Sequence, residues 1–333
     1  MKVSLGLGLT NACNLTCAHC YRPDPPIAHL PASTVRSVCD SLDVAGVNLG
    51  TGENALHPDF HEVLAELLDR GLRVSLTSNG LSISALDDAT LKRLHDVEVS
   101  IDLPAEVRFD DFRGPGAFRT AVGALERCAE LGVRTTVLAV LMRSNHRDLG
   151  ELAVLAASLG APLRVNLYQP SKTDSFLPSY DEMWHAVREL LSTTTVLACS
   201  EPVICAAAGL PGDGLRCGRT SLRITPQGTL LPCVYWPTSA GTAQDVGRLG
   251  EALFEGHEFR ALRTVPADCA ACEWVAVCGG GCASRRVLTG VGLAGRDPFC
   301  PKIAGVDLRG LARTETVGDR LHTGNVCTLL VQA

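Results

Sequence analysis

The segment Cys13-Asn14-Leu15-Thr16-Cys17-Ala18-His19-Cys20 decides how the rest of the chain is interpreted. Its three thiols follow a C-x3-C-x2-C spacing within eight residues. An Fe–S cluster is normally held by four thiolates, so three close cysteines without a nearby fourth predict a cluster with one open iron. Catalytic metal sites bind exogenous ligands at such open positions. A zinc site or a group of buried thiols is the alternative interpretation of the same spacing.

The composition limits the classes of protein to which the chain can belong. It has 333 residues, 46% of them hydrophobic, which suffices for one large domain and a smaller one. The net charge is -6 and no basic block is present, so we expect no nucleic-acid partner. We find no signal peptide and no apolar run of about 18 residues, and therefore expect a cytoplasmic protein without a membrane partner. In a reducing compartment, the 15 cysteines indicate metal ligands or catalysis before disulfides.

The first half of the chain alternates strands and helices. The expected strands cover residues 3–9, 47–49, 72–76, 97–101, 133–142 and 162–168. The expected helices cover residues 32–43, 58–69, 84–95, 117–131, 148–159 and 179–191. Six such units predict an α/β domain with a parallel sheet, either open or curved into a partial barrel. Polar residues follow the first four strands, at the carboxyl edge where parallel α/β folds build their sites.

The character of the sequence changes after about residue 195. Helical periodicity fades, Gly and Pro become more frequent, and cysteines accumulate. We therefore expect a first domain over 1–200 and a small, irregular, cysteine-rich domain over 201–310. A C-terminal tail over 311–333 ends in apolar residues, and we expect it to pack on the body of the protein.

The first cysteine group resembles the cluster motif of the radical S-adenosylmethionine (SAM) superfamily. The resemblance rests on Cys13, Cys17 and Cys20 in the context of Asn14-Leu15-Thr16 and Tyr21, and it covers about residues 1–170. It implies a partial (β/α)6 TIM-like barrel whose three thiolates hold a [4Fe–4S] cluster, with SAM on the fourth iron. Reductive cleavage of SAM would give a 5′-deoxyadenosyl radical that abstracts hydrogen from a substrate. An electron donor such as flavodoxin or ferredoxin is the implied partner.

Later segments resemble motifs that bind SAM in this superfamily, with departures. Thr51-Gly52-Glu53-Asn54 stands where the family has Gly-Gly-Glu-Pro, and Glu53 would accept a charge-assisted hydrogen bond from the methionine ammonium. A solvated loop carboxylate is the alternative interpretation of Glu53. Thr77-Ser78-Asn79-Gly80 resembles the family's Thr-Asn-Gly element, and Ser100-Ile101-Asp102 resembles its Ser-x-Asp pair.

Arg113 and His19 complete the implied SAM site. Arg113 could pair with the methionine carboxylate, for which Arg119 and Arg143 are alternatives. His19 stands where the family has an aromatic ring beside adenine, and it could stack there or be an ordinary loop histidine. The implied SAM contacts are therefore His19, Gly52, Glu53, Asn79, Ser100, Asp102 and Arg113.

A second cysteine group occupies the last third of the chain, with a more specific spacing than the first. Its seven members are Cys217, Cys233, Cys269, Cys272, Cys278, Cys282 and Cys300. The set resembles the SPASM domain of radical SAM enzymes, which carries two auxiliary [4Fe–4S] clusters. Two zinc sites are the alternative, because thiolates bind both metals.

The SPASM resemblance implies an interleaved allocation of ligands. Cys269, Cys272, Cys278 and Cys300 would hold an outer cluster, and Cys217, Cys233 and Cys282 would hold an inner one. The fourth thiol of the inner cluster would come from Cys205 or, failing that, Cys199. If neither binds, its open iron could bind substrate. The expected cofactors are therefore three [4Fe–4S] clusters and SAM.

Three cysteines remain outside these motifs. Cys39 and Cys128 fall within predicted helices, where we expect them to be core thiols. Cys327 could donate a hydrogen atom to a substrate radical, as an epimerisation requires, or it could be a packed cysteine of the tail.

These observations predict an oxidoreductase-type radical SAM/SPASM enzyme. We expect a small natural-product substrate first, such as an aminoglycoside, sugar or nucleoside antibiotic intermediate, undergoing dehydrogenation, epimerisation or a related change. This preference rests on a first strand at residue 3, with no preceding module to bind a leader peptide. The alternative is a maturase that crosslinks, oxidises or epimerises a ribosomally made peptide. A non-catalytic Fe–S or zinc protein would leave the first cysteine group and the polar strand ends unexplained.

Overall fold

The computed structural model describes residues 1–22, 26–212, 217–315 and 327–333. Within these ranges one sheet contains eleven strands. The strands are β1 Val3–Leu7, β2 Val44–Leu49, β3 Arg73–Ser78, β4 Asp96–Ser100, β5 Thr135–Leu141, β6 Leu163–Leu167, β7 Thr195–Cys199, β8 Ser221–Ile224, β9 Leu230–Leu231, β10 Arg313–Thr314 and β11 Leu329–Gln332. Their order across the sheet is β10-β7-β11-β6-β5-β4-β3-β2-β1-β8-β9.

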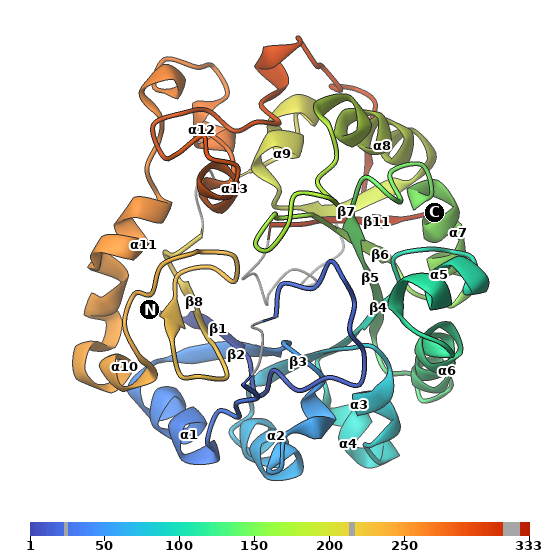
Figure 1. The fold of residues 1–333 in the computed structure, drawn as a ribbon, viewed down its shortest axis with the longest axis vertical. Helices are drawn as coiled ribbons and strands as arrows, with labels where there is room; N and C mark the ends of the chain where they lie inside the picture. The colour runs from blue at the N-terminus through green and yellow to red at the C-terminus, as the bar shows by residue number, and fades with distance from the viewer. Residues whose placement is uncertain (23–25, 213–216, 316–326) are drawn as a thin grey trace.

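Helices connect these strands and cover the outer side of the sheet (Figure 1). They are α1 Ala32–Ser41, α2 Phe60–Asp69, α3 Leu81–Ser84, α4 Asp88–Arg93, α5 Glu106–Arg113, α6 Ala117–Glu130, α7 Leu149–Ser158, α8 Tyr180–Thr193, α9 Pro202–Ala208, α10 Ala243–Leu249, α11 His257–Leu262, α12 Val275–Cys278 and α13 Ala283–Leu288. No helix among the described residues is long and apolar enough to span a membrane.

The first six strands are parallel and lie side by side in chain order. Figure 1 shows the sheet curving around a central space, with the loop after β1 crossing the inside of the curve. Because successive strands are joined through helices on one side, the sheet closes partway towards a barrel. The expected α/β fold, a partial (β/α)6 barrel, is therefore confirmed.

The two faces of each strand differ in polarity, which gives the barrel a polar interior. Side chains alternate between the faces of a strand. Leu5, Val47 and Val97 are fully buried with the other apolar residues of the core. At the intervening positions, residues such as Asn48 and Glu98 line an internal cavity instead. This alternation leaves room for a ligand where a filled barrel would hold apolar side chains.

Two helical expectations need correction. The expected helix over 84–95 is shorter in the structure, where only α4 falls within it and α3 ends at Ser84. Asp87 sets the start of α4 by accepting a hydrogen bond from the Thr90 amide at 2.8 Å. Helix α5 was not expected. Phe109 is its one buried residue, so the segment lacks the apolar periodicity on which the prediction depends.

The sheet extends into the segments predicted as a second domain and a tail. Strand β8 pairs in parallel with β1. Strand β11, at the C-terminus, lies between β6 and β7 and is antiparallel to both. The cysteine-rich segment lies between the two ends of the curved sheet, where α10 packs on α1 and α12 packs on α9 (Figure 1). The tail therefore contributes to the central sheet, while the domain limits remain a prediction.

We predict that Leu330→Ala destabilises the protein by about 2–5 kcal/mol, because the side chain is fully buried in β11 and its loss leaves a cavity. Urea-induced unfolding under anaerobic, reducing conditions measures the change. Ile303→Ala is the control, since that side chain is 54% exposed and its loss should stay within about 0.5 kcal/mol. Equal midpoints for the two variants would contradict the insertion of the tail into the sheet.

Candidate active site and metal centres

A cavity of about 800 Å³ is lined by residues of the curved sheet and by cysteines of both groups. Cys13, Cys17 and Cys20 line it from the loop after β1. The cysteines of the second group and the tail that line it are Cys199, Cys205, Cys217, Cys233, Cys282 and Cys327. Thiols from both predicted cluster regions therefore face one shared space.

The loop that carries the first three thiols is held by its own backbone and by one arginine. The Cys20 amide donates to the Cys17 carbonyl at 3.1 Å. Arg22 donates to the carbonyls of Asn11 and Leu15, at 2.7 and 3.0 Å, and so spans the loop. These bonds hold the loop from which the three thiols line the cavity.

The chemistry of this donor set fits an Fe–S cluster. All three side chains are thiols, and Asn79 Nδ2 lies 3.8 Å from Cys13 Sγ as a hydrogen-bond donor. Burial raises the pKa of the Cys13 and Cys17 thiols, so their thiolates need a bound cation at neutral pH. Among the residues that the structure describes, no three His, Cys, Asp or Glu side chains converge as they would on a single metal ion. Ligation by these cysteines remains a prediction.

Gly52 fastens the end of β2 to the cysteine loop. Its φ is +62°, and an added Cβ would lie 2.3 Å from the Ala12 carbonyl oxygen. The amide of the next residue, Glu53, donates to the same carbonyl at 2.8 Å. Only glycine gives both the left-handed backbone and this close approach.

Glu53 is buried and links the ends of β2 and β3. Its carboxylate accepts hydrogen bonds from Ser78 Oγ at 2.5 Å, the Asn79 amide at 2.9 Å and the Ser82 amide at 2.8 Å. The alternative of a solvated loop carboxylate is therefore wrong. Glu53 lines the cavity, and its contact with a methionine ammonium remains a prediction.

Arg113 and Asp102, both predicted as SAM contacts, pair with each other. Arg113 Nε and Nη2 donate to Asp102 Oδ2 at 2.8 and 2.5 Å, and the Val140 amide donates to Oδ1 at 2.9 Å. Burial by itself would raise the pKa of Asp102, but the Arg113 guanidinium and its other partners hold this pKa below its usual value. Arg113 lines the cavity, whereas the alternatives Arg119 and Arg143 are exposed and pair with surface glutamates.

His19 packs on an aromatic ring of the protein. Its imidazole stacks on Phe112, with ring centroids 4.8 Å apart and planes at 17°. Burial lowers the His19 pKa to about 4, so the ring is neutral at physiological pH. His19, Ser100 and Asn79 all line the cavity, and adenine stacking on His19 remains a prediction.

Two contacts near the first cysteines were missed from the sequence. Arg223, on β8, donates to the Gly50 carbonyl and the Thr51 hydroxyl at the end of β2. Tyr21 and Tyr235 meet edge to face with centroids 5.4 Å apart. Neither contact could be predicted from the local sequence, because the partners are about 170 to 210 residues apart and β8 was not predicted.

The four predicted ligands of the outer cluster are brought together by the fold. Cys269, Cys272, Cys278 and Cys300 line a second, small cavity beside α12. The Cys272 amide donates to the Cys269 carbonyl at 3.1 Å, which curves the backbone between these two thiols. This grouping supports the allocation without testing it.

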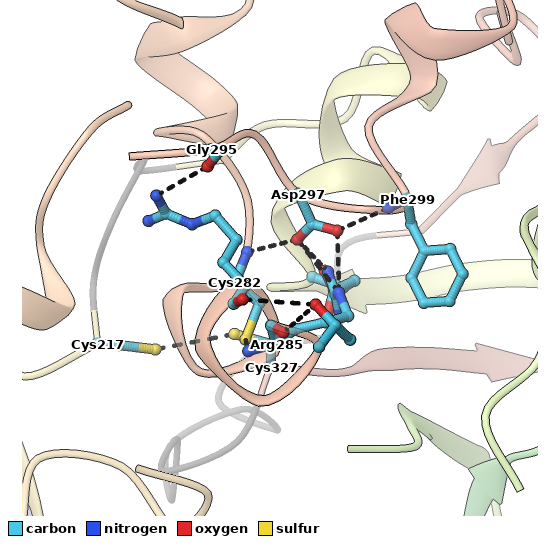
Figure 2. A network of polar contacts seen from close by, with 10 residues as sticks. Cys217, Cys282, Arg285, Gly295, Asp297, Phe299 and Cys327 are labelled. Carbon is cyan, nitrogen blue, oxygen red and sulfur yellow. Dashed lines mark hydrogen bonds and ion pairs between the residues drawn. The ribbon is translucent and has the colours of Figure 1, made fainter. Parts of the chain in front are cut away.

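The predicted inner group is joined by the cysteine of the tail. Cys217 Sγ lies 3.8 Å from Cys327 Sγ (Figure 2). Cys282 also forms a side-chain hydrogen bond with Cys327. Cys205 Sγ instead donates to the Cys199 carbonyl at 3.6 Å. Cys39 and Cys128, expected as core thiols, are buried in α1 and α6.

Comparison with known proteins agrees with this geometry. Residues 7–156 match the model of the radical SAM superfamily. The chain is 31% identical to the mycofactocin maturase MftC of Mycolicibacterium smegmatis, over 88% of this chain and 81% of that protein. It is 24% identical to the AdoMet-dependent heme synthase of Oleidesulfovibrio alaskensis, over 88% and 85%. It is 25% identical to the PqqA peptide cyclase of Ruegeria pomeroyi, over 88% and 86%.

Among solved structures, Streptococcus suis SuiB bound to its precursor peptide SuiA shares the fold. The TM-score is 0.67 at 17% identity, over 90% of this chain and 76% of that chain. The expected SPASM-type radical SAM resemblance is confirmed by these relatives and structural neighbours.

We predict that Gly52→Ala reduces SAM binding by about tenfold or more, because the new Cβ displaces the cysteine loop. Equilibrium binding of SAM to the anaerobically reconstituted protein, with iron content measured in parallel, tests this.

Gly71→Ala is the matched control. Gly71 has a similar φ of +70° but no atom within 4 Å of an added Cβ. It should cost about 1–2 kcal/mol of stability through backbone strain and leave SAM binding unchanged. Equal losses of binding in both variants would mean that strain, and not the contact with the cysteine loop, makes Gly52 necessary.

Proposed function

The chain belongs to the radical SAM superfamily, and from this premise we propose that it is a peptide maturase that oxidises, epimerises or crosslinks a ribosomally made precursor. The small natural-product substrate that we expected first has less support than this alternative. That expectation relied on the start of the chain, whereas a maturase matches 88% of the chain at 31% identity. A second relative, similar over the same share, is named as a peptide cyclase.

The cavity is the observation that carries the proposal. Its volume of about 800 Å³ is in the upper part of the range of ligand pockets, and it continues from the first cysteine group to the second. The cavity also has polar side chains from β6 and the segment after it, namely Arg164, Asn166 and Gln169. These residues are far in sequence from every predicted SAM contact. A peptide side chain entering this space could be held by these groups.

The residues of the chain have separate roles in this proposal. Cys13, Cys17 and Cys20 would hold the cluster at which SAM binds, and SAM supplies there an organic radical able to remove a hydrogen atom from a substrate. Asn79, by donating to Cys13 Sγ, would stabilise the thiolate form of that ligand. Arg113 carries the positive charge that a bound carboxylate would meet. Glu53 keeps the ends of β2 and β3 in register around the site.

The second cysteine group would accept the electron that an oxidation leaves behind. Removal of a hydrogen atom makes a substrate radical, and formation of a double bond or crosslink then releases one further electron. The proposed auxiliary clusters provide a place for this electron inside the same protein. The similarity to a heme synthase keeps a small-molecule substrate as the second candidate.

Cys17→Ala and Cys272→Ala should separate SAM cleavage from substrate turnover. With dithionite and SAM, we expect Cys17→Ala to form no 5′-deoxyadenosine and Cys272→Ala to retain its formation. Each variant should lose about four irons per chain. The Cys272→Ala protein should release little modified product, because its outer cluster is missing.

The substrate class is tested by co-expression with any short peptide that is found encoded beside the gene, followed by mass spectrometry. A loss of two mass units, or an epimerised residue detected after hydrolysis, is expected for wild-type protein and absent for Cys17→Ala. An unmodified peptide, together with 5′-deoxyadenosine formation stimulated by a small-molecule candidate, would contradict the peptide proposal.

A further inference from the structure

We propose that Cys327, from the C-terminal tail, is the fourth thiolate of the inner auxiliary cluster, with Cys217, Cys233 and Cys282. The inference rests on the auxiliary clusters of the proposed function and names the ligand that the sequence left open. It makes the tail part of a metal centre.

The first argument is the position of the Cys327 sulfur. It lies 3.8 Å from Cys217 Sγ, and Cys327 also shares a side-chain hydrogen bond with Cys282. Cys233 is buried, lines the same cavity and packs in one apolar cluster with Cys217. Figure 2 shows the sulfurs of Cys217, Cys282 and Cys327 directed towards one another. Four thiols are the ligand number that a [4Fe–4S] cluster takes.

The second argument concerns the competing cysteine. Cys205 was the first choice from sequence because it lies just before Cys217. In the fold, its thiol donates to the Cys199 carbonyl at 3.6 Å, and the two side chains also contact each other. The thiols of Cys217 and Cys282 both contact Cys327, whereas the thiol of Cys205 contacts Cys199.

The third argument is that Cys327 is held in place by the strand that follows it. The amides of Ser200 and Glu201 donate hydrogen bonds to the carbonyl of the next residue, Thr328, at 2.8 and 3.2 Å. The Thr328 amide donates to Ser200 Oγ at 3.1 Å, and its hydroxyl donates to the Val165 carbonyl at 3.2 Å. Strand β11 then pairs on both sides. The backbone next to the thiol is therefore fixed by the sheet.

The same network fixes Cys282 on the opposite side. The Cys282 amide donates to Asp297 Oδ2 at 2.7 Å. Arg285 is completely buried and pairs with Asp297 at 2.6 Å (Figure 2). It also pairs with Glu201 at 2.8 Å. Glu201 is also the residue whose amide reaches Thr328. One set of buried bonds therefore positions both thiols relative to each other.

The proposal has two chemical consequences. Four protein thiolates leave no open iron on the inner cluster, so the substrate would not bind to that iron. A ligating thiolate carries no S–H hydrogen to donate, so the proposal replaces the hydrogen-atom donor role that the sequence suggested for Cys327. The inner cluster would then serve electron transfer only.

The experiment uses the full chain in a Cys13→Ala/Cys17→Ala/Cys20→Ala background, which removes the SAM-binding cluster and leaves the auxiliary ones. Cys327→Ala is compared with Cys205→Ala, a matched loss of a thiol from the same cavity. Iron and sulfide per chain and the electron paramagnetic resonance spectrum of the dithionite-reduced protein are measured. Neither readout needs SAM or a peptide.

We expect the iron content of Cys327→Ala to fall from about eight to about four irons per chain. If the inner cluster is retained, its resonance signal should be altered. Cys205→Ala should match the parent. Cys327→Ser, which offers an oxygen ligand, should retain more iron than Cys327→Ala and shift the signal, which a purely structural role would not cause.

An unchanged Cys327→Ala spectrum, with loss of iron in Cys205→Ala, would overturn the assignment and leave the proposed function intact. A Cys217–Cys327 disulfide in the iron-loaded protein would overturn it as well. A parent protein without auxiliary iron would overturn both this assignment and the auxiliary clusters of the proposed function.

Discussion

The buried ion pairs of Arg285 are the interaction on which the arrangement of the second cysteine group depends. Arg285 and its partners Glu201 and Asp297 are all at most 2% exposed. Removing one partner of a buried ion pair typically costs about 3–5 kcal/mol, because the remaining charge is left without compensation. The three residues come from the loop after β7, from α13 and from the loop before Cys300. They therefore connect the sheet with the cysteine-rich segment, and the Glu201 amide adds the tail through the Thr328 carbonyl.

The buried carboxylate of Glu53 has a similar structural role beside the first cysteine group. Glu53 accepts bonds from the segment after β3, and the Gly52–Glu53 backbone contacts the cysteine loop. In both regions a buried carboxylate satisfies backbone amides of segments distant in sequence. Buried charges are tolerated only when they are fully hydrogen-bonded. The positions of the thiols therefore follow from the rigid polar networks beside them.

The sequence predicts the elements whose signal is local. Alternating apolar residues predict β1 to β6, and cysteine spacing predicts both groups of thiols. Prediction fails where a partner comes from far along the chain. Arg223 reaches the site on β8, and Cys327 reaches it two residues before β11. Both strands have four residues, and their place in the sheet depends on non-local pairing. Cys205 was preferred for its nearness in sequence, whereas the fold brings residue 327 to Cys217. Helix α5 was missed because it buries only Phe109 and therefore shows no apolar periodicity in the sequence.

Electrostatics explains the value of a neutral aromatic pair and a cation on the wall of the cavity that both cysteine groups line. Thiolate clusters are anionic, and like charges in a shared, weakly polar cavity repel strongly. Tyr21 and Tyr235 meet edge to face on the wall of the cavity, and burial raises the pKa of Tyr235 well above its usual value, so the ring remains uncharged. Arg223 lines the same cavity and lies beside the Tyr21 hydroxyl at 3.5 Å. Its positive charge would offset the negative charge of thiolates in both cysteine groups, which would let the two predicted clusters face one cavity.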